Sequence, residues 1–189
     1  MDEKMENIDG MREDVLVVID GRGEKIVVIP KIIFKGKRSI SWKEVERYLI
    51  QYIGKIFQVS ETEDLILIDK TFVDEYTGSN YTNKLVGALP KVKANMSQGI
   101  PQMIEIATEK RWKEDFDNKH KKRAGKGWFR YNTRFAMPVT NDDGEIVEYN
   151  IYQAVLIVRY SADGKLYLYD VQNIKKETRY PSRTNMSDG

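Results

Sequence analysis

Residues 128–139, WFRYNTRFAMPV, alternate between two kinds of side chain along their length. The odd positions from Phe129 to Val139 are mostly apolar, whereas Arg130, Asn132 and Arg134 occupy even positions. Because successive side chains of a β-strand point to opposite faces, this pattern predicts a strand with one face in the core and a polar, cationic row on the other. Such a row suits a polyanion.

Two Asp-Gly turns extend this strand into a predicted antiparallel meander. The turn at 141–144, NDDG, leads into EIVEYNIYQAVLIVR, and the turn at 162–164, ADG, leads into KLYLYDVQNI. Glycine can adopt the positive φ that a tight hairpin requires. The middle strand is apolar on both faces at 155–158, so we expect it to be central and covered on both sides, with the upstream helices as the candidates to cover it.

The remaining segments predict an α+β fold: helices packed on an antiparallel meander of at least three strands, with an additional N-terminal hairpin. Gly21-Arg22-Gly23 separates two β-branched runs and predicts that hairpin. Helical spacing predicts helices near 41–53, 84–97 and 101–113, the first capped by Ser39 or Ser41. Two strands are expected around 61–64, in a second small sheet or added to the main one, and 71–83 is expected to be an ordered loop.

These elements suggest four parts of the chain. Residues 1–12 are predicted to be disordered; 13–75 hold the hairpin, a helix and the strand pair; 76–178 form the helix-helix-meander domain; and 179–189 form a loose tail.

The composition of the 189 residues argues against several classes of protein. The chain has no Cys and a single His, which excludes disulfides and leaves no usual zinc ligand set, so no metal or other cofactor is expected; acidic residues at turns leave a magnesium site open. No apolar run approaches the roughly 18 residues of a membrane span, and the acidic N-terminus does not resemble a secretory signal. We therefore expect no membrane partner and a cytoplasmic protein, with its oligomeric state open.

The formal net charge of +2 hides a basic cluster between Lys110 and Arg134, which contains ten Lys or Arg against three Asp or Glu. Cations on one face can contact phosphates, and interleaved aromatic residues can stack on bases. We predict nucleic-acid binding, with RNA favoured over DNA, by Lys110, Arg111, Trp112, Lys121, Lys122, Arg123, Lys126 and Arg130. The alternative is a solvated, basic loop and helix end.

The single histidine, His120, lies within this cluster and has a side chain suited to proton transfer near neutral pH. A metal-independent ribonuclease needs a base, an acid and cations that stabilise charge on phosphorus. The candidate catalytic residues are His120, Tyr131, Arg134 and Arg159. The alternative is an exposed histidine in a basic loop.

Three stretches carry a resemblance to a known family: 91–139, from KVKANMSQGIP to RFAMPV; 149–159, YNIYQAVLIVR; and 163–177, DGKLYLYDVQNIKKE. Over about 45–178 the chain resembles a large polyvalent protein-associated domain of phages and integrative elements. Its element order is more weakly similar to the barnase, EndoU, colicin and RelE-like nuclease superfamily, although EndoU-type enzymes use two histidines. The resemblance implies action in the cytoplasm of a bacterial host, or association with a virion.

Three functions remain open. A metal-independent endoribonuclease or toxin-type domain predicts that His120, Tyr131 and Arg134 converge in a cleft. A non-catalytic counter-defence module that binds nucleic acid or a host defence protein predicts a broad basic surface without a cleft. A structural domain of a virion-associated protein would use the charge for DNA packaging or solubility.

Overall fold

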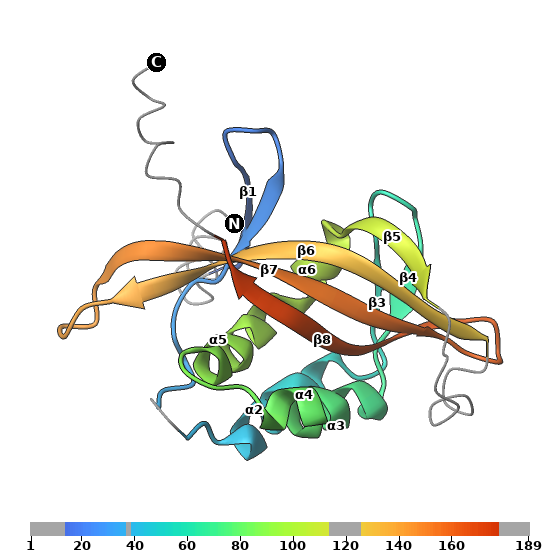
Figure 1. The fold of residues 1–189 in the computed structure, drawn as a ribbon, viewed down its shortest axis with the longest axis horizontal. Helices are drawn as coiled ribbons and strands as arrows, with labels where there is room; N and C mark the ends of the chain where they lie inside the picture. Colours follow the sequence, from blue (N-terminus) through green and yellow to red (C-terminus); the bar gives the residue numbers. More distant parts are fainter. Residues whose placement is uncertain (1–13, 37–38, 114–125, 178–189) are drawn as a thin grey trace, which may run out of the picture.

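The structure is a computed structural model that describes residues 14–36, 39–113 and 126–177. Eight strands form one curled, mixed sheet in the order β1-β2-β6-β7-β8-β4-β3, with β5 paired to β6 outside this path (Figure 1). The strands are β1 Leu16–Ile19, β2 Lys25–Val28, β3 Ile56–Gln58, β4 Leu65–Leu67, β5 Thr108–Lys113, β6 Gly127–Thr140, β7 Ile146–Tyr160 and β8 Leu166–Lys176. With its helices, the chain has the predicted α+β fold.

The predicted meander and N-terminal hairpin are both present. Strand β7 pairs antiparallel with β6 on one side and with β8 on the other, and β1 pairs antiparallel with β2. Gly144 and Gly164, in the two meander turns, each have a φ of 83°, which explains why glycine is needed there. The strand pair β3–β4 joins the main sheet, because β4 pairs with β8 in parallel.

Strand β6 changes its partner along its outer edge. Its first half pairs antiparallel with β5, as far as Asn132 opposite Thr108. Two residues in its second half, Phe135 and Ala136, pair in parallel with β2. The edge is therefore divided between two neighbours, and residues 133–134 lie at the junction.

The helices lie together on one side of the curled sheet (Figure 1). They are α2 Trp42–Leu49, continued by a 3-10 turn at Ile50–Tyr52; α3 Lys70–Gly78; α4 Asn80–Asn83; α5 Leu89–Met96, continued by a 3-10 turn at Ser97–Gly99; and α6 Ile100–Glu105. Odd-numbered residues of β6, such as Tyr131 and Phe135, join helix residues such as Phe72 in the main hydrophobic cluster. The helices thus cover one face only. On the other face of the sheet, Val155 and Ile157 belong to a small second cluster with two aromatic residues.

The expectation of a loop at 71–83 is wrong, because this segment forms α3 and α4. Asp69 caps α3 by accepting a hydrogen bond from the backbone N–H of Phe72, and Ser79 caps α4 in the same way from Thr82. Phe72 and Tyr76, which are four residues apart, are fully buried. Burial of this short apolar stripe outweighs the weak helix propensity of its Thr and Gly neighbours.

The predicted helix at 101–113 is correct only in its first part. Helix α6 ends at Glu105, and residues 108–113 form β5. The apolar spacing that buries Met103 and Ile104 does not continue beyond α6. All six residues of β5 are exposed, and the strand pairs antiparallel with β6. Strand pairing with a distant segment therefore overrides the local helical pattern.

Buried residues from both sides of the expected domain boundary near residue 75 contribute to the main cluster, and residue 75 itself lies inside α3.

Within the described ranges, no helix is long and apolar enough to cross a membrane.

Candidate nucleic-acid interface

Strand β5 and the first part of β6 form a two-stranded surface that we call the cationic ribbon, residues 108–113 and 127–132. In its register, Arg111 lies opposite Arg130, Trp112 opposite Phe129, and Lys113 opposite Trp128. Because side chains alternate along each strand, Arg111, Lys113 and Arg130 share the face that points away from the helices. The alternation read from the sequence placed Arg130 on this outer face, as observed.

The two arginines form the most unusual feature of the ribbon. Directly opposite side chains in an antiparallel pair are close neighbours, and like charges there are destabilising. Arg111 donates a hydrogen bond to the backbone carbonyl of Glu109, at 2.9 Å. In the described part of the chain, neither guanidinium is bonded to an acidic side chain. Burial lowers the pKa of Arg130, and the charge of Arg111 lowers it further. An anion between the two groups would relieve this repulsion.

Aromatic rings cover the other face of the same ribbon. Trp112 is 46% exposed, and its ring meets that of Phe129 edge-on with centroids 4.9 Å apart. Gly127 has a φ of 143°, and a Cβ atom at this position would lie 2.1 Å from the Trp112 ring, so glycine is needed to seat the indole. Lys126 Nζ lies 4.7 Å from the centre of the Tyr160 ring. Exposed aromatic rings beside cations are a surface on which bases can stack.

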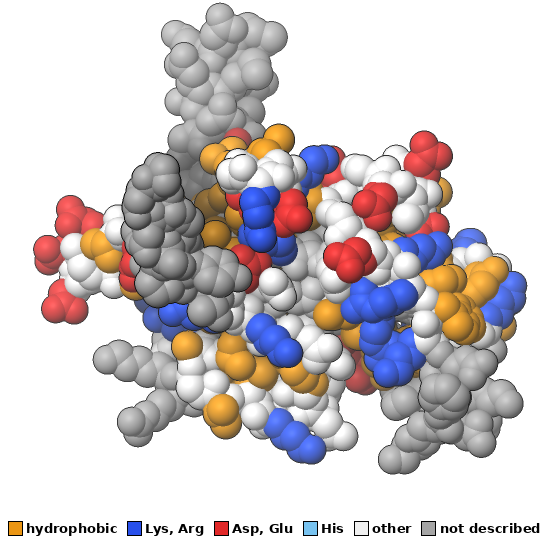
Figure 2. Space-filling view, turned by 45° about the horizontal axis from the view of Figure 1, so that its top comes forward, with side chains coloured by type: hydrophobic (Ala, Val, Ile, Leu, Met, Phe, Trp, Pro, Cys, Tyr) orange, Lys and Arg blue, Asp and Glu red, His pale blue; other side chains and the backbone are white. Residues whose placement is uncertain are grey.

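Figure 2 shows Lys and Arg side chains gathered beside hydrophobic ones on the side of the molecule where β5 and the start of β6 lie. The predicted binding residues Lys110, Arg111, Trp112, Lys126 and Arg130 all belong to the ribbon or adjoin it. The other predicted binding residues, Lys121, Lys122 and Arg123, lie outside the described residues, as does His120.

Lys110 is already neutralised by a carboxylate. Its Nζ lies 2.9 Å from Asp64 Oδ2, and the same carboxylate accepts a hydrogen bond of 2.6 Å from the hydroxyl of Tyr131. Burial would raise the pKa of Asp64, but hydrogen bonds from Tyr131, Lys110 and Thr62 hold it below its ordinary value. The fully buried Tyr131 has a raised pKa because of its burial and its bond to Asp64, so its phenol remains a hydrogen-bond donor.

Arg134 is also engaged within the protein. Its Nε and Nη2 donate to the two carboxylate oxygens of Glu177 at 2.8 and 3.0 Å, and its Nη1 donates to Asp20 at 2.9 Å. These bonds, led by those to Glu177, raise the pKa of Arg134. Its side chain is only 15% exposed. Arg134 therefore connects β6 to the N-terminal hairpin and to the end of β8.

Arg159, the last predicted catalytic residue, forms an ion pair with Asp69, and its guanidinium carbon lies 4.3 Å from the centre of the Tyr167 ring. Each of the three described catalytic candidates is thus bonded to a carboxylate. Tyr131 and Arg134 point to opposite faces of β6, since they are three residues apart on one strand. The structure does not bring these side chains together.

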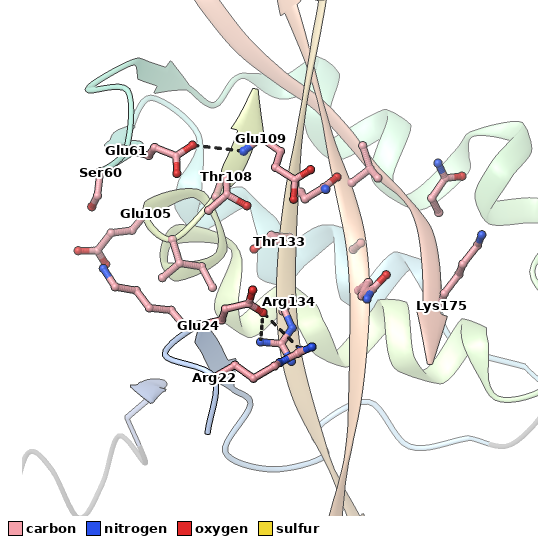
Figure 3. Close-up of a pocket in the computed structure, with 18 of the residues that line it drawn as sticks. Arg22, Glu24, Ser60, Glu61, Glu105, Thr108, Glu109, Thr133, Arg134 and Lys175 are labelled. Carbon is pink, nitrogen blue, oxygen red and sulfur yellow. Dashed lines mark hydrogen bonds and ion pairs between the residues drawn. The ribbon is translucent and has the colours of Figure 1, made fainter. Parts of the chain in front are cut away.

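A groove of about 950 Å³ adjoins the cationic ribbon at the junction on the edge of β6. Its walls come from the hairpin turn at 22–25 and from the start of β5, and its lining includes Arg134 and Lys175 (Figure 3). Glu61, Glu105 and Glu109 gather at the other end, where Glu61 accepts a hydrogen bond from the Glu109 backbone N–H at 3.2 Å. These carboxylates would repel phosphates, so they would limit an anionic chain to the part of the ribbon beyond Glu109. No pattern in the sequence predicted this groove.

In the described ranges, no three His, Cys, Asp or Glu side chains are arranged to hold a metal ion.

Comparison with family models, with curated proteins and with solved structures found no match to this chain.

The network around Arg134 predicts a specific loss of stability in acid. A hydrogen bond from the Glu24 backbone N–H, assisted by Arg134, lowers the pKa of Asp20 from 3.8 to about 2. As the pH falls, the Asp20 carboxylate is therefore protonated in the unfolded chain before it is protonated in the folded protein. The stability that Asp20 contributes is present above pH 4 and is lost as the pH falls toward about 2. In urea titrations at several pH values, the wild type should lose its advantage over Asp20→Asn across this range. If the free energies of unfolding of the wild type and Asp20→Asn change with pH in the same way, Asp20 does not have a lowered pKa in the folded protein.

Proposed function

We propose that this protein is a non-catalytic nucleic-acid-binding module that contacts single-stranded RNA through the cationic ribbon. The observation that supports this most is the pair Arg111 and Arg130, which lie opposite each other without an acidic partner in the described residues. Two arginines side by side bring no advantage to a surface that serves only solubility. In a surface that binds phosphate, they provide two adjacent guanidinium groups, each with several N–H donors.

The neighbouring groups fit the same ligand. Lys113 lies on the same face as the two arginines, and Lys126 lies where β6 begins, so further phosphates along a strand would meet further cations. Trp112 offers an exposed ring on the opposite face of the ribbon, which a flexible single strand can reach by passing around the outer edge of β5. Stacking on such a ring requires an unpaired base, which favours a single strand over a duplex.

The contacts of the other candidates favour binding over cleavage. Cleavage of RNA without a metal needs an acid and a base within hydrogen-bond reach of the reacting phosphate. The candidate side chains are instead bonded to carboxylates of the protein: Tyr131 to Asp64, Arg134 to Glu177, and Arg159 to Asp69. These bonds connect separate elements of the fold. We therefore prefer the binding module over the toxin-type endoribonuclease. We further propose that this binding module acts in a bacterial host in counter-defence, which is one of the roles that the resemblance to a polyvalent domain of mobile elements allows.

The test is to mix the full chain with fluorescently labelled single-stranded RNA in EDTA and to measure anisotropy and RNA length together. Four cations at the ribbon predict that affinity falls roughly 50-fold between about 50 mM and about 200 mM salt, with the RNA intact. A duplex of the same sequence should bind more weakly. Cleavage in EDTA would replace this proposal with the ribonuclease, and the absence of binding at low salt would refute both.

A further inference from the structure

The two sides of the arginine pair, Arg111 and Arg130, carry opposite charges. On the side where β5 begins, Glu109 precedes the pair and gathers with Glu61 and Glu105 at one end of the groove (Figure 3). All three of these residues are exposed. A phosphate on this side would meet carboxylates before it reached the cations at the opposite end of the groove. An anionic chain is therefore opposed in this direction.

Strand β6 offers no alternative path on the same side. Asn132, the next residue after Arg130 on the outer face of β6, is uncharged. Arg134 follows it, but this guanidinium is already bonded to Glu177 and Asp20. On the outer face of residues 127–140, Arg130 is thus the last cation in this direction that is not bonded to a carboxylate of the described chain.

The other side of the arginine pair carries cations. Lys113 lies two residues beyond Arg111 on the same face of β5, opposite Trp128. Lys126 immediately precedes β6, whose first residues pair with the end of β5. In the described residues, Lys126 contacts the ring of Tyr160 and no carboxylate. A phosphate chain bound to the arginine pair can therefore continue in this direction only, so the pair lies where the chain must begin or end.

We propose that the arginine pair holds the terminal phosphate of a single-stranded RNA, a phosphate monoester at its 5′ or 3′ end. This inference rests on the proposed function. A bridging phosphate has one negative charge and two free oxygens, whereas a terminal phosphate has nearly two charges at pH 7 and three free oxygens. Two guanidinium groups can bind the terminal group in parallel, because the bond from Arg111 to the Glu109 carbonyl uses only one of its N–H donors.

The surroundings of Arg130 strengthen its interaction with such a group. Ile157 lies opposite Arg130 on β7, and it belongs to the second hydrophobic cluster together with Trp128. These apolar side chains keep water from one side of the guanidinium, and charges interact more strongly where water is partly excluded. A group with nearly two charges gains more from this than a group with one.

The test compares three single-stranded RNAs of one sequence, each with an internal fluorophore: one with hydroxyl groups at both ends, one with a 5′-phosphate and one with a 3′-phosphate. Anisotropy is measured with the full chain at low salt. At least one phosphorylated RNA should bind at least about tenfold more tightly than the hydroxyl RNA. Arg111→Gln/Arg130→Gln should bind all three equally. Lys43→Gln/Lys70→Gln, which removes two exposed charges elsewhere, should keep the preference.

The other outcomes separate this inference from the proposed function. If the wild type binds all three RNAs equally, the protein binds RNA but the arginine pair does not hold its end. If the preference persists in Arg111→Gln/Arg130→Gln, other residues hold the terminal phosphate, and the inference is wrong. If none of the RNAs binds, both the inference and the proposed function are refuted.

Discussion

Replacement of Asp170 with Ala should lower the free energy of unfolding by about 3–5 kcal/mol, because it leaves a buried lysine without its counter-ion. Lys93 Nζ lies 2.8 Å from Asp170 Oδ1, and both side chains have no exposed surface. Burial lowers the pKa of Lys93, and Asp170 opposes this effect. Asp170 also accepts hydrogen bonds from Ser79 and from the backbone N–H of Val171, so one carboxylate connects α4, α5 and β8.

Urea denaturation measures this loss, and Asp142→Ala in the exposed turn between β6 and β7 is the matched control. The control should change stability by less than about 0.5 kcal/mol, since Asp142 is exposed. The double variant Lys93→Met/Asp170→Leu should recover much of the loss, because two apolar side chains need no counter-ion. A loss of less than about 1 kcal/mol for Asp170→Ala would show that the ion pair is not structurally important.

The second large effect concerns RNA binding. The double variant Arg111→Gln/Arg130→Gln should bind single-stranded RNA about 30-fold more weakly, since each lost phosphate contact removes roughly 1 kcal/mol. The same variant should not be less stable than the wild type. Removal of two opposed like charges should instead stabilise the fold by up to about 1 kcal/mol. Weaker RNA binding together with higher stability is expected where a protein retains an unfavourable contact for its function.

Lys43→Gln/Lys70→Gln is the matched control, because it removes the same charge from exposed positions on α2 and α3. Its RNA affinity should change by less than about threefold, since these lysines lie away from the ribbon. Equal losses in the two double variants would mean that only the net charge of the protein matters, and the ribbon would then have no special role.

The meander could be predicted from the sequence because its signals are local. Alternation in β6 and glycine at two turns define three neighbouring strands without reference to distant residues. Strand β5 could not be predicted in this way. It follows α6 directly, and only its pairing with β6, some twenty residues further along the chain, determines its conformation. Helix α3 was missed because its apolar residues are few and its caps depend on geometry.

The candidate site shows the same limit more sharply. Alternation correctly placed Arg130 and Arg134 on the same face of β6, yet residues far away in the sequence give them different contacts. Arg134 is bonded to Glu177 and Asp20, which are 43 and 114 residues away in the sequence. Arg130 instead lies beside Arg111. The sequence gives the position of each cation, but only the fold shows which of them already has a partner.

The dependence of RNA affinity on salt concentration tests the central claim most directly, because its slope counts phosphate contacts and does not depend on the fraction of folded protein. For single-stranded RNA, each contact contributes about 0.7 to the slope of log affinity against log salt. We predict that Arg111→Gln/Arg130→Gln has a slope shallower than that of the wild type by about 1.4. Identical slopes would contradict the account, because Arg111 and Arg130 would then make no contact with phosphate.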